Sequence, residues 1–132
     1  MSDENMRIDH IPEAAHLRVE GTLREAVHLD ENGKTSDAVN VLVQLVAEFP
    51  ESAQAHSYLG WMLSKKGKHR EAIEHGRLAV KFEPASERVS LLFFRVLWSA
   101  QEYQEAFAEM QRFSAYGHSE EYVRMMAEWK GA

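Results

Sequence analysis

The histidines have the widest chemical range of any side chains in this sequence, because imidazole titrates near neutral pH and binds transition metals. The chain contains seven of them. A helical metal site places two ligands three or four residues apart, and no two histidines have that spacing. His69 and His75 stand six residues apart, and His16 stands four residues before Glu20 on a surface-like face. The sequence therefore predicts no metal site.

Other catalytic arrangements are also missing from the pattern. No serine stands in a nucleophile elbow, and no glycine-rich loop could hold a phosphate. The adjacent carboxylates Asp30 and Glu31, and likewise Glu120 and Glu121, fall at expected helix ends, where solvation explains them. The chain has no cysteine, which excludes disulfides and thiolate chemistry. We therefore predict a protein that is not an enzyme and uses no cofactor.

A 34-residue step organises the elements that position these side chains. Small, apolar and turn-forming residues recur at that step: Ala38, Ala72 and Ala106; Leu29, Leu63 and Leu97; Gly33 and Gly67; Pro50 and Pro84; Ser52 and Ser86. Small side chains allow helices to approach closely. Self-similarity at this period predicts stacked helical hairpins that share a concave surface.

Glycine, proline and serine mark the expected helix ends. Gly33 and Gly67 lack a β-carbon and can take the left-handed conformation that closes a helix. Pro50 cannot continue a helix, and Ser52 can accept a hydrogen bond from the free N–H groups that begin the next one. We expect helices at residues 12–31, 35–48, 53–66, 69–82, 87–100, 103–115 and 120–130, after a flexible tail at 1–11.

Charge and hydropathy limit the partners. The net charge is −6, and the one basic stretch is a turn around Lys65, Lys66, Lys68 and Arg70, so nucleic acid is a poor fit and solvation explains the turn. No apolar run approaches the roughly 20 residues of a membrane span, and the polar, acidic first ten residues do not resemble a signal peptide. We expect a cytoplasmic protein without membrane insertion, and a periplasmic location stays open because many periplasmic proteins also lack cysteine.

The middle of the chain resembles a tetratricopeptide repeat in His56-Ser-Tyr-Leu59-Gly60-Trp-Met-Leu63, Gly67, Ala72, Gly76, Ala79 and Pro84. The resemblance implies an all-α solenoid of antiparallel helix pairs, wound as a right-handed superhelix of about seven helices. It implies one domain at residues 12–130, with repeats at 19–52, 53–86 and 87–120 and a capping helix at 120–130. The sequence departs from the repeat pattern at Glu25, Phe94, Gln101 and His118.

In this family the inner helices line a concave groove that binds partner proteins. The positions that the resemblance places there are Leu23, Val27, Asp30, Ser57, Trp61, Lys65, Arg88, Leu91, Arg95 and Trp98. These residues imply an apolar, aromatic groove edged by cations. We expect Trp61 and Trp98 to anchor an apolar segment of another protein and the three cations to pair with its acidic residues. The alternative is that both tryptophans pack in the core.

Members that hold the acidic C-terminal tail of heat-shock chaperones use five polar or basic positions. The equivalent residues here are Leu23, Val27, Tyr58, Arg88 and Leu92. Only Arg88 fits, so the resemblance does not extend to that co-chaperone role.

The expected function is therefore a protein-interaction module, either an adaptor, an assembly factor or a small chaperone. Two alternatives stay open. One is a dedicated single-client binder, such as a type III secretion chaperone or a toxin-immunity protein. The other is a self-assembling scaffold or homodimer, since apolar bulk gathers near the C-terminus at Phe93, Phe94, Phe113, Tyr116, Met125 and Trp129.

Overall fold

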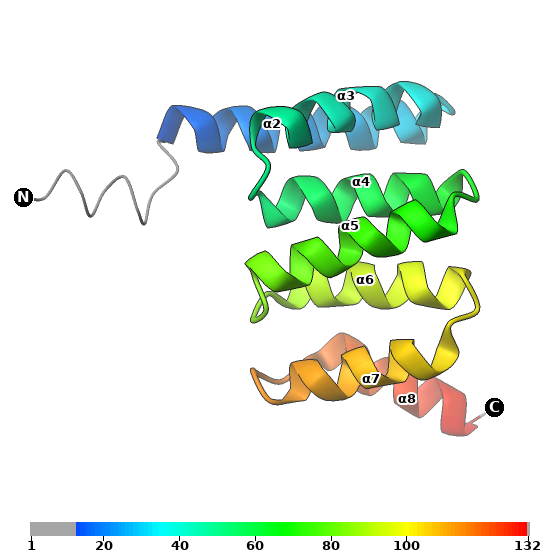
Figure 1. Ribbon diagram of the computed structural model, residues 1–132. Helices are drawn as coiled ribbons and strands as arrows, with labels where there is room; N and C mark the ends of the chain where they lie inside the picture. The colour runs from blue at the N-terminus through cyan, green and yellow to red at the C-terminus, as the bar shows by residue number, and fades with distance from the viewer. Residues whose placement is uncertain (1–12, 132) are drawn as a thin grey trace, which may run out of the picture.

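Seven α-helices make up residues 13–131, the part of the chain that the computed structural model describes (Figure 1). They are α2 (Glu13–Glu31), α3 (Thr35–Glu48), α4 (Ala53–Lys65), α5 (His69–Phe82), α6 (Glu87–Ser99), α7 (Tyr103–Ser114) and α8 (Glu120–Gly131). No strand occurs within these residues, so the all-α prediction is confirmed. Each predicted helix end lies within one residue of the observed one where the structure describes it. The tail predicted at residues 1–11 lies outside the described residues.

The three hairpin turns repeat one backbone arrangement. Lys34 N–H donates to the carbonyl of Leu29, and the same bond recurs 34 and 68 residues later, at distances of 2.8, 3.0 and 2.9 Å. Each turn contains one residue with positive φ: Gly33 and Gly67, both at +79°, and Gln101 at +64°. The prediction that the two glycines close their helices is confirmed. The third turn keeps the conformation although it lacks the glycine.

Serine side chains begin the inner helices. The Oγ of Ser52 accepts a hydrogen bond from the backbone N–H of Ala55 at 3.1 Å, as predicted for a residue that caps a helix. Ser86 caps α6 in the same way at 3.2 Å, and Ser119 caps α8 at 3.2 Å. These caps fix where α4, α6 and α8 start.

Small residues set the spacing between helices. In the stack, α4 contacts α2, α3, α5 and α6, so α2, α4 and α6 form an inner layer and α3, α5 and α7 an outer one (Figure 1). A β-carbon added at Gly60 would lie 2.9 Å from the carbonyl oxygen of Ala72 on α5. One added at Gly76 would lie 2.4 Å from Cδ1 of Phe93 on α6. The helices can approach this closely only because both positions are glycine.

Aromatic side chains fill the C-terminal core. Phe93, Phe94 and Phe113 are at most 5% exposed and pack with Tyr122 of α8. These residues seal the solenoid from within, which was one of the two roles considered for them. Tyr116 does not join them, because 54% of its surface is exposed.

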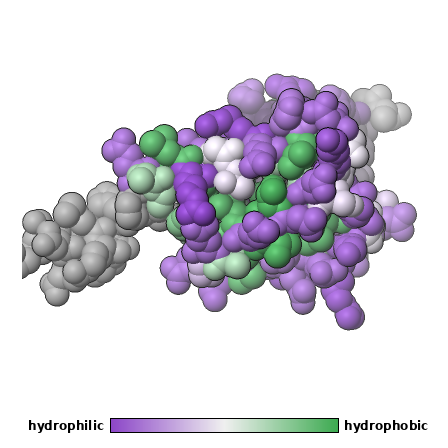
Figure 2. Space-filling view, turned by 90° about the horizontal axis from the view of Figure 1, so that it is seen from above, coloured by the Kyte–Doolittle hydropathy of each residue, from purple (hydrophilic) through white to green (hydrophobic). Residues whose placement is uncertain are grey.

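Apolar surface also remains at the opposite end of the stack, formed by α2 and α3. Figure 2 views this end and shows a band of apolar side chains flanked by polar ones. Leu17 of α2 is 62% exposed, and Val43 of α3 is 50% exposed. None of the helices within residues 13–131 is both long enough and apolar enough to cross a membrane.

Candidate partner-binding groove

Three adjoining cavities lie on the inner face of the stack and form one groove. The N-terminal cavity has a volume of about 620 Å³ between α2, α4 and the start of α6. The central cavity, about 560 Å³, shares Tyr58 and Arg88 with it. The C-terminal cavity, about 650 Å³, shares Trp61, Arg95 and Glu121 with the central one. Because neighbouring cavities share residues, a ligand could occupy the groove along its whole length.

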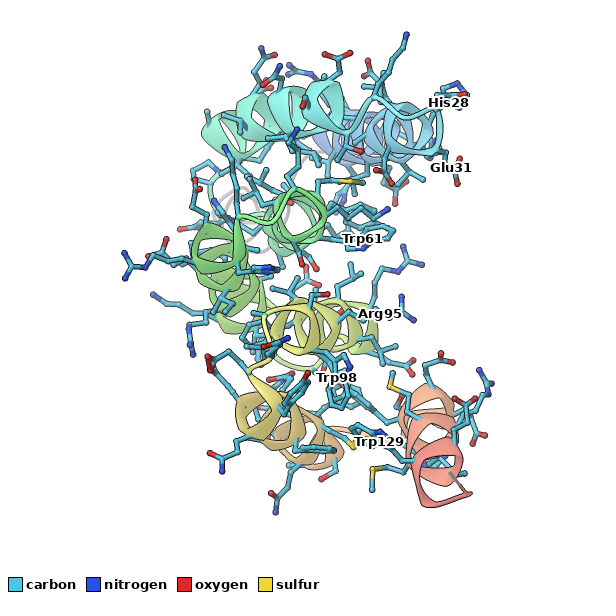
Figure 3. All side chains as sticks on the ribbon, turned by 90° about the vertical axis from the view of Figure 1, so that its right-hand side faces the viewer. His28, Glu31, Trp61, Arg95, Trp98 and Trp129 are labelled. Carbon is cyan, nitrogen blue, oxygen red and sulfur yellow. The ribbon has the colours of Figure 1, made fainter. Side chains whose placement is uncertain are left out.

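The C-terminal cavity has aromatic walls on two sides. Trp61 stands on α4, while Trp98 on α6 contacts Trp129 on α8 with ring centroids 4.5 Å apart (Figure 3). Trp98 also stacks on Phe94 at 5.8 Å and meets Tyr103 edge-on at 4.6 Å. Trp98 is therefore partly a packing residue and partly a wall of the groove. Trp61 has a single aromatic contact within the described residues, with Tyr58 at 6.2 Å.

Most cations of the groove are paired with carboxylates of the chain itself. Lys65 forms an ion pair with Asp30 and lies 4.4 Å from the centroid of the Trp61 ring. Its hydrogen bond to Asp30, helped by a second from Thr35, lowers the pKa of that carboxyl despite partial burial. Arg95 pairs with Glu121 at 3.8 Å. Charges expected to meet a partner are thus already largely balanced.

Arg88 differs from these cations. One of its N–H groups donates to the Tyr58 hydroxyl at 3.2 Å, and it forms no ion pair within residues 13–131. It lines both the N-terminal and the central cavity.

The structure brings most of the predicted groove residues together and moves two of them elsewhere. Residues that line the cavities are Leu23, Val27, Trp61, Lys65, Arg88, Leu91, Arg95 and Trp98. Ser57 was expected to face the groove, but it is only 4% exposed and lines none of these cavities. Asp30 acts inside the fold as the partner of Lys65 and Thr35.

The fourth inner helix supplies residues that the sequence analysis did not assign to the groove. Helix α8 had been assigned only a capping role. It contributes Glu121, Met125, Glu128 and Trp129 to the C-terminal cavity. The 34-residue step could have identified it, since α8 begins 33 residues after α6 and so takes the place of a fourth inner helix. Arg24, Tyr58 and Gln54 of the N-terminal cavity were also missed.

A buried polar network fixes α8 against the last repeat. The carboxylate of Glu109 on α7, in a residue 5% exposed, accepts hydrogen bonds from Ser90 at 2.6 Å and from Arg112 at 2.7 and 2.9 Å. The Ser90 hydroxyl also meets the Tyr122 hydroxyl at 2.8 Å. Arg112 donates in turn to the carbonyl of Pro84 at 2.9 Å. Through Tyr122, this network determines where α8 stands as a groove wall.

One histidine pair forms through tertiary contact. Nε2 of His56 lies 2.7 Å from the carbonyl oxygen of Pro50, which can only accept, so this nitrogen carries the proton. Nδ1 of the neutral ring is then an acceptor for Nδ1–H of His75, 3.0 Å away. Burial, followed by the neighbouring His56, lowers the pKa of His75. Within residues 13–131, no three metal-ligating side chains gather at one point.

Comparisons with known proteins point to one repeat family. Residues 23–87 match the family model described as tetratricopeptide repeat. A structure titled "MamA 41-end from Desulfovibrio magneticus RS-1" aligns with a TM-score of 0.65 at 18% identity over 86% of this chain, which spans about three fifths (61%) of that chain. A second, titled "Crystal structure of MamA", aligns with a TM-score of 0.64 at 18% identity, covering 86% of this chain and 63% of that one. No curated protein matches the sequence. The matched repeats, the 34-residue turns and the solenoid fold identify this chain as a tetratricopeptide repeat protein.

Proposed function

We propose that this protein is an adaptor, assembly factor or small chaperone that holds a segment of another protein in its concave groove, without catalysis. The observation that carries the proposal is the C-terminal cavity, in which Trp61 faces the Trp98–Trp129 pair across about 650 Å³. Aromatic anchors in such pockets supply much of the affinity of protein interfaces. A helix or an extended segment with apolar residues suits a groove of this kind.

Trp61 is the residue that tests the proposal most cleanly. It packs less with other rings than Trp98 does, so Trp61→Ala should remove a groove wall with a smaller effect on the fold. We would purify the tagged wild type and Trp61→Ala from the native cell and compare bound proteins by mass spectrometry. Tyr116→Ala, which removes an exposed ring outside the three cavities, is the matched control. A partner retained equally by all three proteins would contradict groove binding.

A dedicated single-client role is one form of this function. A type III secretion chaperone would co-purify with a secreted, hydrophobic client when the two are expressed together. A toxin-immunity protein would instead co-purify with a toxin enzyme such as a nuclease or lipase. Co-expression with neighbouring genes and subsequent pulldown distinguishes these forms from a general adaptor.

Self-assembly is a second candidate, favoured by the exposed apolar surface at the C-terminal end. Tyr116 and Val123 are 54% and 52% exposed, and an apolar cavity of about 530 Å³ lies between α7 and α8 there. Light scattering over a dilution series tests it. A mass that stays at one chain at all concentrations would rule out this candidate.

A further inference from the structure

The cations of the groove fall into two groups. Lys65 and Arg95, at the C-terminal cavity, form ion pairs with Asp30 and Glu121. The C-terminal cavity is also lined by a further carboxylate, Glu128. Because these charges are balanced, an acidic partner residue gains little at that end.

The N-terminal cavity offers cations without such pairing. Arg24 and Arg88 both line it, and neither forms an ion pair within the described residues. Tyr58 accepts a hydrogen bond from Arg88, so its own hydroxyl proton remains free to be donated. Glu20 and Glu31 line the same cavity from other turns of α2. A guanidinium fork beside a phenol proton matches the geometry of a carboxylate.

Distances along α6 fix the spacing of the two subsites. Arg88 and Trp98 are ten residues apart on this helix, which corresponds to about 15 Å at the α-helical rise. An extended peptide covers that distance in about four or five residues, and a helix covers it in about ten.

We propose that the partner is a protein segment with a carboxylate side chain that binds between Arg88, Tyr58 and Arg24, and a large aromatic or aliphatic side chain that fills the cavity between Trp61 and Trp98. The proposal rests on the groove function proposed above. It adds which end of the groove receives the acidic residue and how far the apolar residue lies from it.

The test is a selection of random 12-residue peptides displayed on phage against the immobilised full chain. We expect enriched peptides to carry Glu or Asp four or five residues from Phe, Trp or Leu. Selection against Arg88→Glu should replace the acidic residue by Lys or Arg, while Arg70→Glu, the same charge change on an exposed residue of α5 outside the groove, should leave the preference unaltered. Selection against Trp61→Ala should keep the acidic preference and lose the aromatic one.

A wild-type peptide should bind Arg88→Glu at least about tenfold more weakly, the usual size for a hydrogen-bonded charge. Circular dichroism checks that each variant is folded. Peptides that depend on Trp61 but lack an acidic preference, or that do not respond to Arg88→Glu, would overturn this inference and leave the groove function standing. If no peptide depends on Trp61, both proposals fail. A wild-type dimer that Arg88→Glu dissociates would make a second copy of the chain the occupant and overturn the inference.

Discussion

Gln101 is the one described residue other than glycine with a positive φ, and this allows a stability prediction with a definite sign. It occupies, at φ +64°, the turn position that Gly33 and Gly67 occupy at φ +79°. The left-handed conformation costs a residue with a β-carbon about 1–2 kcal/mol. Glycine avoids this cost but loses about 0.5–1 kcal/mol through the greater freedom of the unfolded chain.

The variant Gln101→Gly should therefore raise the free energy of unfolding by about 0.5–1 kcal/mol. The melting temperature should rise by about 2–4 °C, given the unfolding entropy of a domain of this size. Gln101 is exposed, so its side chain contributes little packing that the substitution could remove.

The reciprocal variant, Gly67→Gln, is the matched control. A β-carbon at Gly67 would meet no atom within 4 Å, so its cost comes from the backbone conformation alone. Thermal and urea unfolding followed by circular dichroism should show it less stable than the wild type by about 1 kcal/mol. The reasoning would be refuted if Gln101→Gly lowered stability, or if Gly67→Gln left it unchanged.

Three further predictions concern the packing and the buried polar groups. Gly76→Ala should destabilise by about 1–2 kcal/mol in urea unfolding, because overlap with Phe93 outweighs the helix propensity gained, whereas Gly21→Ala, which meets only a flexible arginine tip at 4.0 Å, should be neutral or stabilising. As the pH falls below about 6.5, the wild type should lose stability, since the unfolded chain takes up a proton at His75 before the folded one does; His75→Gln should flatten that slope in melts between pH 7.5 and 5, and an unaltered slope would contradict the assignment. Glu109→Ala should cost about 3 kcal/mol in the same unfolding assay by leaving Ser90 and Arg112 without their acceptor, and a change under 1 kcal/mol would argue against a structural network.

Local features of the sequence were sufficient to predict the helices and their ends. Gly33, Gly67, Ser52 and Ser86 act through hydrogen bonds to residues at most five positions away. Such interactions depend on neighbouring residues only, so the pattern of residue types already contains them. The 34-residue step then implies which helices stack, because each repeat can bury its apolar side only against the next.

The chemistry of the groove depended on contacts between residues far apart in the chain. Lys65 lost its expected role to Asp30, 35 positions away, and Ser57 became buried. His56 and His75 meet from adjacent helices, and Trp129 reaches Trp98 only because the polar network around Glu109 holds α8 in place. Side-chain pairing across helices depends on rotamers and exact spacing, which the residue pattern does not encode locally. The sequence by itself thus determined a tetratricopeptide solenoid with an inner groove, and only the tertiary packing decided which of its charges remain available to a partner.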